Sequence, residues 1–195
     1  MSTLKVNTIQ NVSGGSDVTN LGSWKKLSTT TISSNVDNVT FTNSITDAFD
    51  TYNMYAIVFS QLQPTDDDNK LRLRIQESGS TVTSGVYRYR VFSPDGQENG
   101  QNDSQMRLNK DPLGNATSGS AISEDVNGII YMTGFMTNRR WRFQSTIMTG
   151  TVSADNNFDF AGGGINNTNA TTGVLIYPDS GQWASGTATL FGIAK

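Results

Sequence analysis

Two residue types are missing from this chain of 195 residues, which contains no cysteine and no histidine. Without them there is no Ser-His-Asp or Cys-His nucleophile, no zinc site of the usual ligands, no haem, no iron–sulfur cluster and no redox thiol. These absences exclude classical proteases, thioredoxin-like enzymes and zinc modules. They also exclude disulfides, which small extracellular β-domains commonly carry. A protein of this kind that works outside a cell needs another source of stability, and oligomerisation is the obvious one.

Long apolar runs and strong charge are also missing. No window approaches 18 apolar residues, and the opening MSTLKVNTIQ has no apolar run flanked by basic residues. We therefore expect neither a membrane span nor a signal peptide. We also expect that the chain is made in a cytoplasm. The net charge is −3 and the isoelectric point is about 4.8, which disfavours nucleic acid as the main partner.

Small polar residues are abundant. The chain has 21 Ser, 24 Thr, 19 Asn and 19 Gly, and these favour turns and sheet surfaces over helices. Only 35% of the residues are hydrophobic, but charged residues make up only 16%, and the 9 Phe, 6 Tyr and 3 Trp argue for a buried core rather than disorder. The composition predicts a folded all-β protein.

The first 23 residues differ from the rest. Leu4, Val6 and Ile9 give an apolar rhythm too sparse for a core, and Ser13 to Ser16 (SGGS) follow as a flexible break. We interpret residues 1–23 as an arm or linker, with a frayed terminus as an equally open alternative. Residues 24–195 fit one domain.

Alternating segments begin at Trp24. Tyr52–Leu62 (YNMYAIVFSQL) is apolar on both faces and is the best candidate for a central strand. Lys70–Gln76 (KLRLRIQ) and Val86–Phe92 (VYRYRVF) alternate apolar residues with arginines, which predicts half-buried strands with a basic solvent face. Their arginine stripes could pair with acidic neighbours across the sheet.

Two hairpins are predicted in the second half of the chain. Gly128–Phe135 and Trp141–Val152 are joined by a polar turn, and Gly173–Tyr177 and Gly186–Ala194 are joined through Pro178-Asp179-Ser180-Gly181. The only helical signal, Ser44–Tyr52, is sufficient for a turn or two.

About eleven strand candidates fit two packed antiparallel sheets. The predicted fold is an all-β, jelly-roll-like antiparallel β-sandwich with an extended N-terminal arm. Pro94–Ser104 and Lys110–Asp125 are rich in turn residues and are predicted as long loops, which are common places for recognition.

The motifs that could carry chemistry are weak. Asp66-Asp67-Asp68-Asn69 is the only concentrated acidic run, but it lacks the spacing of a calcium loop, so we interpret it as a solvated turn and predict no metal site. Gly162-Gly163-Gly164 lacks the context of a dinucleotide fingerprint and is interpreted as a bend or bulge between strands. Paired carboxylates of the glycosidase kind stay open, since their separation in space is not given by sequence.

A basic and aromatic cluster lies at Arg139-Arg140-Trp141-Arg142. Such a cluster can bind phosphate or stack on sugars and bases. The acidic isoelectric point argues against this. We instead expect Trp141 in the core, Arg139 and Arg140 in the turn, and Arg142 facing solvent.

The two ends and the middle of the chain resemble one group of proteins. The opening Ser2–Gly14 (STLKVNTIQNVSG), the central YNMYAIVF and KLRLRI, and the ending TGVLIY followed by SGTATLFGI are similar to segments of tail-fibre and virion structural proteins of tailed bacteriophages, of the cyanophage and marine-phage type. The resemblance covers about a third of the chain, and the order of the motifs matters more than any one of them.

The resemblance implies a jelly-roll-like virion protein, assembled as a homotrimer, whose arm (Leu4, Val6, Ile9) docks to other phage tail or capsid proteins. Our leading hypothesis is a non-enzymatic tail fibre or receptor-binding appendage without a cofactor, made in the host cytoplasm and located in the virion. Its loops at Asp66, Asp67, Asp68, Arg139 and Arg140 are the candidate contacts to host surface polysaccharide. The alternative is a capsid decoration or tail-assembly protein that binds only other virion proteins. A glycan depolymerase is a third hypothesis.

Overall fold

The computed structural model describes residues 24–42, 52–110, 125–135, 140–150 and 156–193, and every regular element within these ranges is a β-strand. The strands are β1 (Trp24–Ile32), β2 (Val39–Thr42), β3 (Met54–Pro64), β4 (Leu71–Glu77), β5 (Ser80–Thr81), β6 (Tyr87–Ser93), β7 (Gly96–Asp103), β8 (Met106–Arg107), β9 (Val126–Thr133), β10 (Arg142–Gly150), β11 (Asn156–Ile165), β12 (Thr171–Pro178) and β13 (Trp183–Ile193).

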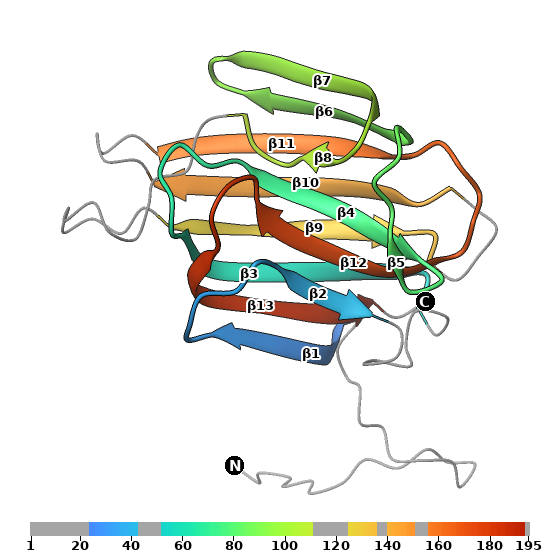
Figure 1. The fold of residues 1–195 in the computed structure, drawn as a ribbon, viewed down its shortest axis with the longest axis horizontal. Coiled ribbons are helices and arrows are strands. Elements are labelled where there is room, and N and C mark those ends of the chain that lie inside the picture. The colour runs from blue at the N-terminus through green and yellow to red at the C-terminus, as the bar shows by residue number, and fades with distance from the viewer. Residues whose placement is uncertain (1–23, 43–51, 111–124, 136–139, 151–155, 194–195) are drawn as a thin grey trace, which may run out of the picture.

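The strands form two antiparallel sheets that pack face to face (Figure 1). The larger sheet has eight strands in the order β1-β13-β3-β9-β10-β11-β6-β7. The smaller has five, in the order β2-β12-β4-β5 with β8 paired to β4, and lies across the front of the larger sheet in Figure 1. The chain passes repeatedly from one sheet to the other, as expected for a jelly-roll-like sandwich. The predicted fold class is confirmed.

The core lies between the two sheets. Leu71, Leu73 and Ile75 of β4 are completely buried, as the alternating pattern predicted. Tyr55, Ile57 and Phe59 face them from β3, which lies inside the larger sheet between β13 and β9. These inward faces exclude water from the space between the sheets and supply most of the apolar burial that stabilises the fold.

The predicted closing hairpin is wrong. β12 pairs with β2 and β4 in the smaller sheet, whereas β13 pairs with β1 and β3 in the larger one. Trp183 anchors the crossing: it is fully buried and its indole nitrogen donates to the carbonyl oxygen of Ile176 at 3.4 Å. Gly181 has a φ of +64°, a conformation that glycine adopts readily. The turn residues predicted the reversal correctly, but a turn signal does not specify which sheet the next strand joins.

Two segments predicted outside strands are strands. Gly96–Asp103, placed in a loop by its composition, is the edge strand β7, where one neighbour and exposed faces tolerate polar residues. Gly162-Gly163-Gly164, interpreted as a bend, lies inside β11. At Gly163 an added Cβ would stand 2.2 Å from the carbonyl oxygen of Arg88 on β6, so close approach of the two strands requires glycine there.

Several predictions concern residues outside the described ranges. They are the N-terminal arm over 1–23, the helical turn over most of 44–52, and nearly all of the loop at 110–125. The predicted pairing of residues 128–135 with residues 141–152 lies mostly within the described ranges. It is confirmed, because β9 and β10 are adjacent antiparallel strands.

Candidate functional site

The acidic run lies in the connection between β3 and β4. Asp66, Asp67 and Asp68 are exposed, and the buried Asn69 holds the connection in place. The amide nitrogen of Asn69 donates to the carbonyl oxygens of Asp66 at 3.1 Å and Ser180 at 2.9 Å. The arrangement is that of a solvated turn. Among the described residues, no three acidic, histidine or cysteine side chains are grouped as metal ligands.

The two predicted receptor loops lie at opposite ends of the larger sheet. The acidic run follows the last residue of β3, whereas the exposed Arg140 precedes β10. Arg142 pairs with Thr133, which pairs with Met54 at the start of β3. The length of a strand of this size, about 35 Å, therefore separates the two loops. Arg139, Leu4, Val6 and Ile9 lie outside the described residues.

The outer face of the eight-stranded sheet, turned away from the smaller sheet, carries a trough across β6, β11 and β10. Gly164 on β11 pairs with Arg88 on one side and Arg142 on the other. Gly162 pairs in the same way with Arg90 and Gln144. The two glycines form a floor without side chains, and the four polar side chains of Arg88, Arg90, Arg142 and Gln144 stand on either side of it. We call these six residues the arginine trough.

The two walls of the trough differ: the arginine on the β10 wall is held by hydrogen bonds, whereas the arginines on the β6 wall have no described partner. The Arg142 guanidinium donates to the carbonyl oxygens of Trp141 at 3.0 Å and Ile165 at 3.1 Å. It lies over Gly164, where an added Cβ would stand 2.9 Å from the guanidinium nitrogen. Arg88 and Arg90 are exposed and have no hydrogen bond or ion pair with the described residues. A shallow depression of about 480 Å³, lined partly by Arg88, Arg142 and the equally unpaired Arg140, continues the trough at its Gly164 end.

The opposite end of the same three strands is apolar. Phe92, Met148, Phe158 and Phe160 are 49%, 51%, 38% and 47% exposed. The strand register places Met148 beside Phe158 and Phe160 beside Phe92, and the Phe158 and Phe160 rings meet edge to face at 4.6 Å. We call these four residues the apolar corner. The corner borders the trough directly, because Phe92 and Phe160 lie two residues, about 6.7 Å, from Arg90 and Gly162 on their strands.

An aromatic row lies on the same face near the other edge. The Trp24 ring meets Phe191 at 5.6 Å and Tyr131 at 5.9 Å. Ala56 lies between Phe191 and Tyr131 in the register and is completely buried. A small residue at this position leaves room for the indole, which extends the apolar surface of the face.

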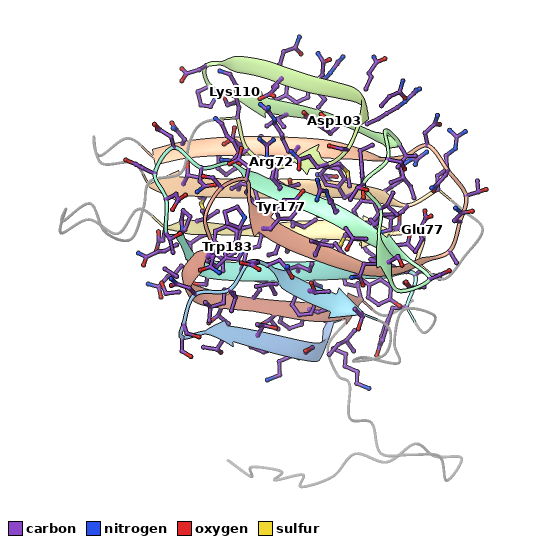
Figure 2. All side chains as sticks on the ribbon, viewed as in Figure 1. Arg72, Glu77, Asp103, Lys110, Tyr177 and Trp183 are labelled. Atoms are coloured by element: carbon purple, nitrogen blue, oxygen red, sulfur yellow. The ribbon has the colours of Figure 1, made fainter. Side chains whose placement is uncertain are left out.

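The arginines around the smaller sheet are neutralised. Arg72 is only 4% exposed and pairs with Asp179, and Arg107 pairs with Glu98. Arg74 lies over the Tyr177 ring at 5.1 Å and donates to Gln105. Tyr177 is paired with Arg72 in the register, and both are labelled in Figure 2. The prediction of a basic solvent face for this strand is therefore wrong at Arg72, because Asp179 on the β12–β13 connection draws its side chain into the protein.

Burial also raises the pKa of three tyrosines, two on β6 and one on β12. Burial raises the pKa of Tyr177 to about 12, with Arg74 acting in the opposite direction. Burial likewise raises the pKa of Tyr89 to about 12, and it raises the pKa of Tyr87, whose hydroxyl donates to the carbonyl oxygen of Val82. These hydroxyls are held as neutral donors in the structure.

Comparisons with family models, with curated proteins and with solved structures found no match to this chain. Within the described ranges, no helix has the length and hydrophobicity needed to cross a membrane. The assignment of a function therefore depends on the geometry of the faces and on the resemblance noted in the sequence.

The sequence interpretation missed both the trough and the apolar corner. The signals were present: Phe92 continues the arginine-bearing face of its strand, and Phe158 and Phe160 alternate with Asp159. Asp159 is completely buried and accepts from the Lys110 amide at 3.3 Å, so the usual assignment of faces is inverted on β11.

Proposed function

We propose that this chain is a structural protein of a bacteriophage virion, a receptor-binding appendage that assembles from several copies, most simply as a trimer. The observation that carries the proposal is the division of one exposed sheet face into an apolar corner and an unpaired arginine trough. One end is suited to assembly and the other is suited to a ligand. The resemblance to tail-fibre and virion proteins supplies the biological setting.

The apolar corner supports assembly with a second copy. Exposed apolar patches of this kind commonly mark association surfaces. The row that continues from Phe160 across the sheet carries Thr146, Ile129 and Val58, so a partner would bury no charge there. Association would also supply stability to a chain that has no disulfides.

Light scattering of the purified protein tests the assembly. We expect a mass near three times 21.1 kDa for the parent chain. Phe160→Ser should shift the mass toward the monomer, and Thr29→Ser, on the same face but away from the corner, should not. A parent protein that is monomeric at all concentrations would contradict the proposal.

The trough favours a receptor-binding appendage over a capsid decoration or tail-assembly protein. The unpaired Arg88 and Arg90 give the face a charged surface beside the apolar corner, on which a ligand can bind. The direct test is binding to a glycan array together with adsorption to bacterial cells. We expect glycan binding and competition with infection by the parent phage. Absence of both, with an intact oligomer, would favour the decoration role.

A further inference from the structure

We propose that the arginine trough binds an anionic polysaccharide through its carboxylate or sulfate groups. This inference rests on the proposed function and adds the chemical class of the ligand and the residues that hold it. Guanidinium groups are well suited to oxyanions because they present a planar fork of donors that matches two oxygen atoms.

The charges of the trough are available to a ligand. No acidic residue faces outward from the described parts of β6, β7, β10 and β11, where the outward side chains are arginine, amide, hydroxyl or apolar. Arg88 and Arg90 have no described partner, in contrast to Arg72 and Arg107, which have carboxylates. An oxyanion would therefore not have to displace an existing ion pair.

The shape of the trough fits a linear chain. Arg88 and Arg90 are two residues apart on one face, which spaces their Cα atoms by about 6.7 Å. Arg142 and Gln144 lie two strands away, which gives a width of about 10 Å. Since Gly162 and Gly164 leave the floor bare, an extended ligand can lie along β11 with its acidic groups between the walls.

A glycan fits better than a nucleic acid. Phe143 lines the depression at the end of the trough but is only 6% exposed, and the floor residues Gly162 and Gly164 have no ring for base stacking. The exposed rings of Phe92 and Phe160 lie beyond the floor in the apolar corner, which the proposed association with a second copy would cover. Gln144, Asn99 beside Arg90 and Asn166 in the depression offer amide groups that can pair with hydroxyls.

Gly162 allows a direct test. An added Cβ there would have Phe143 carbonyl oxygen as its nearest neighbour at 3.8 Å, which is an ordinary contact, so a side chain can be introduced without disturbing the sheet. Gly162→Glu would place a carboxylate between the walls and occupy the site from within. Gly162→Gln is the matched control with the same shape and no charge.

The experiment measures binding of the full chain to three polymers with one backbone: dextran, carboxymethyl dextran and dextran sulfate. We expect the parent protein to bind one or both charged polymers and not neutral dextran, and the better ligand identifies the acidic group. Gly162→Glu and the double variant Arg88→Gln/Arg90→Gln should each weaken binding by about tenfold or more. Gly162→Gln should keep more of the affinity than Gly162→Glu.

The control for net charge is Lys25→Gln/Lys26→Gln, which removes the same charge at the far edge strand β1. It should leave binding within about twofold. Equal losses in the two double variants, preference for neutral dextran, or tighter binding of single-stranded DNA than of either charged dextran would each overturn the proposal. Light scattering of the same variants separates the two proposals, since a failed trough with an intact oligomer leaves the virion role standing.

Discussion

The arginines of β4 and those of β6 have the same sequence pattern and opposite environments. Both strands alternate arginine with large apolar residues. On β4, Arg72 is buried against Asp179 and Arg74 is held by Tyr177 and Gln105. On β6, Arg88 and Arg90 project from the outer face without a described partner. The difference shows that alternation predicts a half-buried strand but not whether its polar face is neutralised or available.

The largest effect is expected from breaking the buried pair. Asp179→Ala removes the carboxylate that faces Arg72 and accepts from the Lys70 amide at 2.6 Å. Because Arg72 would be left as a buried, uncompensated charge, we expect a loss of about 2–3 kcal/mol in the free energy of unfolding, measured by urea denaturation. Asp179→Asn keeps an acceptor for Lys70 and should lose less. A loss below about 0.5 kcal/mol for Asp179→Ala would show that the pair is not important for stability.

The next effect concerns the strand that forms the trough floor. Gly163→Ala would place a Cβ 2.2 Å from the Arg88 carbonyl oxygen, so β6 and β11 would have to separate, at a cost of about 1–3 kcal/mol. Gly162→Ala, one residue away, meets nothing closer than 3.8 Å and should be neutral or slightly stabilising. Urea denaturation of the two variants makes the comparison, and equal stabilities would contradict the close approach of these strands.

High pH should destabilise the fold through tyrosines whose side chains point away from the trough. The pKa values of Tyr89 and Tyr177 are about 12 in the folded chain, against 10.0 for the free side chain. The folded state thus holds protons that the unfolded state releases, and stability falls as pH rises from about 10 toward 12. Thermal denaturation should show a decreasing midpoint over this range. Tyr177→Phe should make the decrease shallower, and an unchanged slope in that variant would argue against the burial of this hydroxyl.

The smallest effect on stability is expected in the trough itself. Arg88→Gln/Arg90→Gln removes exposed side chains without described partners, so the free energy of unfolding should change by less than about 0.5 kcal/mol. An unchanged free energy of unfolding, together with the loss of ligand binding proposed above, would show that these two arginines serve binding and not stability. A large destabilisation would mean that these arginines hold the fold, as Arg72 does.

The sequence predicted most of the strands but not the edge strand β7, and of the two predicted hairpin pairings only that of β9 with β10 is correct. Alternation correctly placed Leu71, Leu73 and Ile75 in the core, since one buried face is a local property of the strand. Which sheet β13 joins depends on pairing with β1 and β3, more than a hundred residues earlier, and no local signal carries that information.

The candidate site was harder to predict for the same reason. The trough requires Arg88, Gly164 and Arg142 to be in register on three strands that are separated in the chain. The apolar corner requires Asp159 to point inward, against its usual preference, and this depends on a polar contact with Lys110 from another part of the chain. The predicted loop sites at Asp66–Asp68 and Arg140 were placed by local composition and lie at opposite ends of the molecule.

The position of β13 between β1 and β3 has a consequence for synthesis. Trp24 pairs with Ile193, so the first described strand has no neighbour until β13 has left the ribosome. A chain that stops early leaves the edge of β3 open and β1 unpaired, and such edges are prone to aggregation and degradation. Only chains that include β13 can close the larger sheet. The fold itself therefore selects against chains that end before β13.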